Sequence, residues 1–258
     1  MAKFRRSIRN ALNAVLVPAG FELARRINKD YVMSFQPLGR TLRRAKKAGL
    51  SVGDYLDQQY QVPGATQADI DQLAALGMFN GKVHAVCEIG PGSGRYLEKV
   101  QRLCAPMSYE IYETDSQWSD WLAKTYHVRA HDADGTSLRE TADESMDLVH
   151  SHKVFVYLPF IVTCRYLTEM IRVTRRGGWI AFDIVSENCM TDSDVDTWIA
   201  SGHHYPCMMP RQFVIDFFAR SQCSFRSSFF APLMPGKSEY LVFVKNEAWS
   251  KGTSPPYS

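Results

Sequence analysis

A glycine-rich turn follows an apolar run near the middle of the chain. The run His84 to Ile89 leads directly into Gly90-Pro91-Gly92-Ser93-Gly94, and a helical pattern follows from Tyr96. Glycines in such a turn let the backbone approach a ligand with no Cβ in the way. The N-terminus of the following helix offers free N–H groups to a carboxylate or a phosphate. The pattern therefore predicts a strand, turn and helix that bind a cofactor.

The spacing of these glycines separates several kinds of cofactor site. A dinucleotide fingerprint, GxGxxG, requires glycine at position 95, where this chain has Arg95. A phosphate-binding P-loop requires a following Lys and Ser or Thr, and neither stands there. The turn instead reads GxGxG and is preceded by an acid, Glu88. Hydride transfer with a nicotinamide cofactor is therefore disfavoured.

Short β-rich runs alternate with helical stretches from Val83 onward. This alternation is typical of a parallel, doubly wound sheet with helices on both faces. The last two runs, 225–230 and 240–245, are joined through Pro235 and Gly236 and indicate a terminal antiparallel pair. The predicted strands are 84–89, 109–112, 147–151 and 179–185, and the predicted helices are 40–47, 66–76, 96–103, 118–126 and 158–174.

The segment Glu88-Ile-Gly-Pro-Gly-Ser-Gly94 resembles motif I of the class I S-adenosylmethionine-dependent methyltransferases, and the similarity extends from Val83 to Lys245. The resemblance implies an α/β fold with the Rossmann-like seven-stranded methyltransferase sheet, mostly parallel with an antiparallel last strand. Two further segments resemble motifs of the family and stand in the expected order. Residues 145–152, which end at His152, resemble the strand-four motif, and residues 175–180, which include Gly177 and Gly178, resemble the turn into the fifth strand.

The resemblance also implies S-adenosyl-L-methionine as the cofactor and assigns residues to it. In the family, an acid at the end of the second strand binds the ribose hydroxyls. Glu113 matches this acid, and Asp115 is a possible substitute. An acid after the third strand meets the adenine amino group; Asp134 fits best and Asp132 competes. The full set expected to bind the cofactor is Glu88, Gly90, Gly92, Ser93, Gly94, Tyr96, Glu113, Thr114, Asp134, Gly135 and Ser151.

Four histidines are candidates for catalysis. A hydroxyl acceptor must lose its proton, and a histidine suits that role, whereas an amine acceptor needs no base. His150 and His152 alternate at the carboxyl end of a strand, so both side chains share one face. His203 and His204 lie in the insertion 186–212, where the family places substrate-binding elements. For each of the four, an ordinary hydrogen-bonded histidine is the alternative.

Other chemistries are less well supported. No Asn/Asp-Pro-Pro-Tyr element follows the fourth strand, which disfavours methylation of nucleic acid bases. The acids Asp183, Glu187, Asp192, Asp194 and Asp196 lack calcium-loop spacing, and a solvated loop is the favoured explanation, so no metal is predicted. The cysteines show no ligand spacing and do not require an oxidising compartment.

Charge is distributed unevenly along the 258 residues. The segment from Lys3 to Lys47 has twelve Lys and Arg against two acids, whereas the whole chain has a net charge of only +3. This arm predicts contact with an anionic partner or a peripheral membrane surface, with a solvated helical face as the alternative. No run approaches the ~18 apolar residues of a membrane span, so a cytoplasmic protein, with a membrane-peripheral alternative, is expected.

These observations predict three parts: a basic helical extension at 1–62, the cofactor-binding domain at 63–248 with a substrate or lid insertion at 186–212, and a flexible tail at 249–258. The start of the chain, with Pro18 and Gly20, resembles bacterial methyltransferases encoded with polysaccharide-building enzymes. The predicted function is therefore O-methylation of a sugar, polysaccharide or other small hydroxyl acceptor. The alternatives are N- or C-methylation of a small metabolite or lipid, and an inactive cofactor-binding scaffold.

Overall fold

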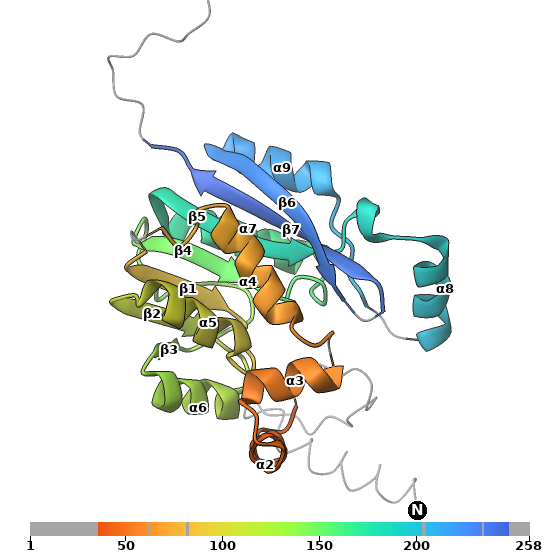
Figure 1. Cartoon of the computed structure of the whole chain (residues 1–258). Helices are drawn as coiled ribbons and strands as arrows, with labels where there is room; N and C mark the ends of the chain where they lie inside the picture. The colour runs from red at the N-terminus through yellow and green to blue at the C-terminus, as the bar shows by residue number, and fades with distance from the viewer. Residues whose placement is uncertain (1–35, 61, 81–82, 203–204, 234, 248–258) are drawn as a thin grey trace, which may run out of the picture. The chain divides into compact units, whose positions relative to one another are not determined.

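A computed structural model describes residues 36–60, 62–80, 83–202, 205–233 and 235–247, all within one compact unit (Figure 1). Three features predicted from the sequence lie outside the described residues. They are the basic N-terminal stretch before residue 36, the histidines His203 and His204, and the tail 249–258. Among the helices that are described, none is both long and apolar enough to cross a membrane.

The described residues form a seven-stranded sheet in the order β3-β2-β1-β4-β5-β7-β6. Pairing is parallel from β3 to β5 and antiparallel where β7 meets β5 and β6, which confirms the predicted methyltransferase sheet. The strands are β1 (Ala85–Ile89), β2 (Ser108–Tyr112), β3 (Arg129–His131), β4 (Met146–Ser151), β5 (Thr174–Ile184), β6 (Cys223–Pro232) and β7 (Lys237–Lys245).

Local sequence sets several helix ends. Gly49, at φ 68°, ends the helix Leu38–Ala48, and the side chain of Asp115 caps the helix Ser116–Tyr126 by accepting the N–H groups of Gln117 and Trp118. Pro159 precedes the helix Phe160–Val173. The helices are α2 (Leu38–Ala48), α3 (Val52–Tyr60), α4 (Ala65–Ala75), α5 (Arg95–Cys104), α6 (Ser116–Tyr126), α7 (Phe160–Val173), α8 (Asp192–Ser201) and α9 (Arg211–Arg220), with a 3₁₀ turn, η2, at Glu187–Cys189.

Each face of the sheet has its own core. Side chains alternate between the faces along a strand, and α4, α5 and α6 cover one face while α7 and α9 cover the other (Figure 1). The first core contains Ile70, Leu97, Leu122 and Leu148, and the second contains Leu167, Phe182, Phe218 and Phe243.

Strand register brings distant polar residues together on the first face. Glu88 of β1 is level with His150 of β4, and Asp183 of β5 is level with Tyr240 of β7. The parallel strands β1 and β4 also end side by side, since Ile89 pairs with Ser151. The glycine-rich turn after β1 and the histidines of β4 therefore lie at the same, carboxyl edge of the sheet.

Candidate active site

The glycine-rich turn leaves open space above Gly92. Gly92 has φ 55°, and a Cβ built there would meet no heavy atom of the described residues within 4 Å. Gly94, at φ 76°, is tightly enclosed, because a Cβ there would lie 2.5 Å from Leu122 Cδ2. The N–H of Gly90 donates to the Tyr112 carbonyl at 2.8 Å and ties the turn to β2. Gly94 has no side chain to cap α5, so the first turn of that helix can receive a ligand carboxylate.

Glu113 lies directly beside this turn. Its Oε2 accepts the N–H of Gly92 at 2.8 Å, and its Oε1 accepts the N–H of Asp115 at 2.9 Å. Each carboxylate oxygen keeps capacity for a second hydrogen bond, as ribose hydroxyls require. Burial raises the pKa of Glu113 above its usual value, against the lowering effect of these backbone donors. The carboxylate of Asp115, in contrast, is occupied as the cap of α6.

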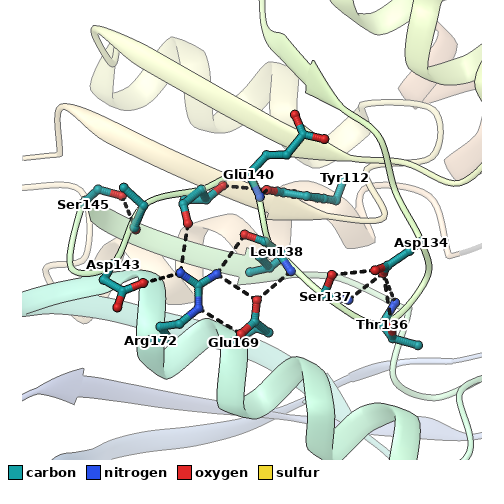
Figure 2. Close-up of polar contacts among 12 residues, drawn as sticks. Tyr112, Asp134, Thr136, Ser137, Leu138, Glu140, Asp143, Ser145, Glu169 and Arg172 are labelled. Carbon is teal, nitrogen blue, oxygen red and sulfur yellow. Dashed lines mark hydrogen bonds and ion pairs between the residues drawn. The ribbon is translucent and has the colours of Figure 1, made fainter.

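The loop after β3 is held by its own polar contacts (Figure 2). Oδ1 of Asp134 accepts the N–H groups of Thr136 and Ser137, both at 2.8 Å, and Oδ2 accepts the Ser137 hydroxyl at 2.6 Å. These donors lower the pKa of Asp134 to about 2, with the Ser137 hydroxyl the largest cause. The competing residue Asp132 is exposed and pairs with Arg139 at 3.2 Å.

Arg172 of α7 anchors the far end of this loop. Its guanidinium donates to the carbonyls of Leu138 and Thr141 at 2.9 and 3.0 Å and pairs with Glu169 at 2.8 Å (Figure 2). Glu169 in turn accepts the N–H of Leu138 at 2.8 Å. The candidate adenine loop is therefore fixed to a helix rather than free to rearrange.

The remaining predicted cofactor residues lie at the same edge of the sheet. Ser93 is buried within the turn, and the Ser151 hydroxyl donates to the Ile89 carbonyl at 3.1 Å. Thr114 is exposed after β2, and a Cβ on Gly135 would lie 3.9 Å from its methyl group. Tyr96 is different, because its buried hydroxyl donates to Asp69 of α4 at 2.7 Å. The structure thus brings most of the predicted set together but directs Tyr96 and the buried carboxylate of Glu88 toward a second group of residues.

That second group is a buried chain of hydrogen bonds across the first face of the sheet. The Tyr109 hydroxyl lies 2.6 Å from Glu88 Oε2 and 2.9 Å from His150 Nε2. His150 Nδ1 lies 2.8 Å from His152 Nε2, and His152 Nδ1 lies 2.8 Å from the Tyr240 hydroxyl. We call Glu88, Tyr109, His150, His152 and Tyr240 the relay. All five are at most 6% exposed.

The far end of the relay meets α4 and α5. The Tyr240 hydroxyl is 3.4 Å from both Asp69 Oδ2 and the Tyr96 hydroxyl. The Tyr96 ring stacks on the His152 ring, with centroids 3.8 Å apart and an angle of 9°. Since both ring nitrogens of His152 already have partners, an acceptor can exchange a proton with this histidine only through another relay residue.

Burial sets the charge state of the relay. Desolvation raises the pKa of Glu88 to about 8, and nearby Glu113 adds to this, whereas the bond from Tyr109 opposes it. Desolvation also lowers the pKa of His150 to about 3 and that of His152 well below its usual value. Both histidines are therefore neutral near pH 7, and Glu88 is mostly protonated.

Lys153 and Asp183 lie next to the relay, at the ends of β4 and β5. Lys153, at φ 56°, donates its backbone N–H to Asp183 Oδ1 at 2.6 Å, and its Nζ donates to the Ser238 hydroxyl at 2.7 Å. Lys153 Nζ is also 3.2 Å from Asp183 Oδ2, but the geometry is that of an ion pair, and Oδ2 accepts no hydrogen bond from the part of the chain that the structure describes. Lys153 was not among the residues predicted for the site, and Asp183, grouped in the sequence with acids of a solvated loop, is instead a buried strand residue.

Arg95, the residue that breaks the dinucleotide fingerprint, has a structural partner. Its guanidinium pairs with Asp57 of α3 at 2.9 Å, and both side chains are mostly buried. Asp57 also accepts the Thr66 hydroxyl at 2.7 Å, which joins α3 to the start of α4. The helices that precede β1 are therefore tied to the first residue of α5, directly behind the glycine-rich turn.

Two other regions do not join this site. A hollow of about 370 Å³, lined in part by Trp179, Arg226 and Glu247, lies at the amino ends of the parallel strands, opposite the glycine-rich turn. Among the described residues, no three His, Cys, Asp or Glu side chains are grouped as a metal site. Asp194 instead pairs with the Thr191 hydroxyl, and Glu187 accepts the Arg211 N–H.

Comparison with known proteins agrees with this geometry. Residues 87–182 match a family model described as a methyltransferase domain. No curated protein has a sequence that matches the chain significantly.

Solved structures of methyltransferases share the fold. The N-methyltransferase NodS from Bradyrhizobium japonicum WM9, in complex with S-adenosyl-L-homocysteine, is 18% identical, with a TM-score of 0.53 over 70% of this chain and 87% of that one. The magnesium protoporphyrin IX methyltransferase from Synechocystis PCC 6803 is 13% identical, with a TM-score of 0.58 over 85% and 100%. An O-methyltransferase family protein from Burkholderia thailandensis is 14% identical, with a TM-score of 0.55 over 83% and 64%.

The domain match identifies residues 87–182 as a methyltransferase domain, and the solved structures show that the chain has the fold of the class I S-adenosylmethionine-dependent methyltransferases. This confirms the class and the cofactor predicted from motif I. At these identities the structural likeness establishes the fold, and the named neighbours include both N- and O-methyltransferases. The acceptor must therefore be inferred from the site itself.

Proposed function

We propose that the protein transfers a methyl group from S-adenosylmethionine to a hydroxyl group of a small acceptor, such as a sugar or a polysaccharide unit. The open space above Gly92, which we call the cradle, supports the cofactor part of this proposal. Only there does the turn leave room for a ligand, and Glu113 and the uncapped start of α5 lie on either side of it. Glu113 would accept the ribose hydroxyls, and the first N–H groups of α5 would receive the cofactor's carboxylate.

The buried histidines carry the acceptor part of the proposal. S-adenosylmethionine supplies a methyl group that is already activated on a sulfonium, so the protein chiefly positions the reactants. A hydroxyl acceptor also loses a proton, which needs a destination. His150 and His152 are neutral and hydrogen-bonded to each other, so they can pass a proton on. The proton would reach His152 through Tyr240, since both nitrogens of His152 are engaged.

One observation favours N-methylation as the second candidate. His152 has no ring nitrogen that faces an acceptor directly, and an amine that binds in its neutral form needs no base in contact with it. In that case Asp183 Oδ2, which accepts no hydrogen bond from any described residue, would bind the amine and orient its lone pair. The two candidates differ in whether His152 is needed for turnover.

Calorimetric titration tests the cofactor site first. S-adenosylmethionine and S-adenosylhomocysteine should bind the wild type, NADH should not, and Glu113→Ala should weaken binding by about 10- to 100-fold, as expected for loss of hydrogen bonds to a charged group. Asp216→Ala, an exposed change on α9, is the matched control and should bind as the wild type does. If the wild type binds neither sulfur cofactor, the enzyme proposal fails and the scaffold alternative takes its place.

An acceptor screen with labelled methyl groups then separates the two chemistries. Sugars and amines are offered to the wild type and to His152→Gln. Transfer to a hydroxyl that is lost in the variant while cofactor affinity is kept supports O-methylation. Transfer to an amine that persists in the variant supports N-methylation and removes the histidines from the mechanism.

The basic character of the N-terminal region supports a separate proposal about partners. Helix α2 exposes Arg40, Arg43, Arg44, Lys46 and Lys47, while Thr41 and Ala45 are buried. We propose that this face contacts anionic lipid headgroups. Less protein should sediment with vesicles that contain phosphatidylserine when these five cations are changed to Gln. With neutral vesicles, the wild type and the variant should sediment equally. Equal sedimentation of the two proteins with the phosphatidylserine vesicles contradicts the proposal.

A further inference from the structure

The relay has only two complete proton arrangements. Its four short links, from Glu88 to Tyr240, are 2.6, 2.9, 2.8 and 2.8 Å long. Each inner member is neutral, and each hydroxyl or neutral imidazole has one proton to donate. All protons must therefore point in the same direction along the chain, either toward Glu88 or toward Tyr240, because a link without a proton would bring two buried acceptors together.

The two arrangements differ by a single proton on Glu88. When Glu88 is ionised, it accepts from Tyr109, and both histidines carry their proton on Nε2. When Glu88 is protonated, it donates to Tyr109, and both histidines carry their proton on Nδ1. In this second case His152 donates to the Tyr240 oxygen, and the Tyr240 hydroxyl is free to donate toward Asp69, 3.4 Å away.

Position ties the Glu88 end of the relay to the cofactor. Glu88 is the penultimate residue of β1, and the turn that cradles the cofactor begins two residues later, at Gly90. Charge at this turn reaches Glu88, because Glu113, which binds the Gly92 N–H, already raises the pKa of Glu88. A sulfonium cofactor brings positive charge to the turn, whereas its demethylated product is uncharged at sulfur. Only the former stabilises an ionised Glu88.

We infer that the relay is a one-proton device controlled by the cofactor: binding of S-adenosylmethionine expels the proton of Glu88 and reverses the relay, which then accepts the proton that the methyl acceptor releases. This inference rests on the proposed function. Glu88, Tyr109 and His150 are positioning residues in it, because they act through His152 and Tyr240.

The proton and electron balance of the transfer is complete. The acceptor oxygen forms a bond to the methyl carbon, the carbon–sulfur bond breaks, and its electron pair stays on sulfur. The acceptor's proton enters at Tyr240, each relay member passes its own proton one link onward, and Glu88 ends protonated. The relay then has the arrangement that suits the uncharged product, and no other co-reactant is needed.

Other ionisable groups surround the relay, and an experiment must distinguish their protons from the proton of Glu88. The faces of the neighbouring elements contribute Arg95 and Cys104 of α5, Asp69 of α4, Lys153 after β4, Asp183 of β5, and Cys87 beside Glu88. A proton measured on cofactor binding is assigned to Glu88 only if it disappears when Glu88 alone is changed. Glu88→Gln keeps the size and hydrogen-bonding ability of the side chain and removes its titration.

Calorimetry in buffers of different ionisation enthalpy tests the first half of the inference. S-adenosylmethionine should release close to one proton per wild-type molecule at pH 7, falling toward zero as the pH rises past about 8. S-adenosylhomocysteine should release none. In Glu88→Gln the difference between the two cofactors should vanish, while Glu110→Gln, a buried acid on the opposite face of β2, should keep it.

Nitrogen-15 spectra of the imidazoles test the second half. In the wild type, S-adenosylmethionine should move the protons of His150 and His152 from Nδ1 to Nε2, and S-adenosylhomocysteine should not. Tyr109→Phe removes one oxygen and cuts the relay, so the histidines should no longer respond, although the cofactor still binds. Unchanged tautomers in the wild type, or proton release that survives in Glu88→Gln, would overturn the inference. Failure of the wild type to bind either cofactor would instead count against the proposed function.

Discussion

The two faces of the sheet are built from alternate residues of the same strands, yet their chemistry differs. The face under α7 and α9 is aromatic at its centre, where the rings of Phe218 and Phe243 stack 4.1 Å apart at 15° and Phe182 packs against both. The face under α4 and α5 places Glu88, Tyr109 and His150 at equivalent depth. Burial is as complete on the polar face as on the aromatic one.

This difference shows what each face contributes. Buried apolar surface stabilises the fold in proportion to its area, and such a core needs only shape. Buried polar groups lose hydration and regain only part of it through hydrogen bonds. In the centre of the polar face, each buried polar group has a hydrogen-bond partner, and the group lies at the edge where the cofactor is proposed to bind. Proton chemistry therefore explains this arrangement better than stability does.

The largest expected effect is on the aromatic face. Phe243→Ala removes a side chain that is 0% exposed and in contact with three other rings, so it should lower the free energy of unfolding by about 3–5 kcal/mol. Phe230→Ala, on a ring 49% exposed beneath Lys237, should cost less than about 1 kcal/mol. Urea unfolding measures both. Similar losses for the two variants would contradict the assignment of the stabilising core to this face.

On the polar face the expected effect depends on pH. The folded pKa of Glu88, about 8, is above its unfolded value, so folding binds its proton more tightly. This contribution is fully present below about pH 4 and is lost as the pH rises to 8, by at most about 1.4 kcal/mol per pH unit. Glu88→Gln should remove this slope, so the variant gains stability relative to the wild type from pH 5 to 8. Parallel curves for the two proteins would show that Glu88 does not titrate in this range.

Local pattern was sufficient to predict much of this molecule. The strands other than β3 and the glycine-rich turn follow from features within a few residues of one another, and the alternation along a strand places His150 and His152 on one face. The seven-stranded sheet and the expected role of Glu113 came instead from the resemblance to the methyltransferase family. The predicted strand at 179–185 begins earlier, at Thr174, which pairs with Met146 before a shift in register. Regular pairing with β4 starts at Trp179, opposite Leu148.

The relay could not be predicted in the same way. Tyr109 and Tyr240 are 41 and 88 residues away from the histidines that they contact, and only strand order and register bring them together. One signal was available, because Glu88, Tyr109 and His150 are polar residues at inward positions of otherwise apolar strands. Asp134 presents a different difficulty. Its oxygens are bonded within its own turn, so its role toward adenine stays a prediction, as does that of Asp132.

Gly92 and Gly94 of the glycine-rich turn allow a further test at the carboxyl edge of the sheet. Both have positive φ, so an alanine costs about 1–2 kcal/mol at either position. Gly94→Ala also collides with Leu122 in the core of the polar face and should lose further stability. Gly92→Ala meets no atom of the described residues and should chiefly weaken binding of S-adenosylmethionine, by tenfold or more. Thermal unfolding together with calorimetry separates the two, and equal binding by Gly92→Ala and wild type would argue against the cradle.

The smallest expected effect comes from an exposed polar cluster, and its pH dependence has the opposite sign to that of Glu88. The donors around Asp134 lower its folded pKa to about 2, below the unfolded value of about 3.9. Its contribution is therefore present above pH 4 and is lost as the pH falls toward 2. Because the carboxylate is solvent-screened, Asp134→Ala should cost less than about 1 kcal/mol at pH 7. Urea unfolding should show that this difference shrinks between pH 4 and pH 2.5, whereas a difference that grows on acidification would mean that the turn is held by something other than the ionised carboxylate.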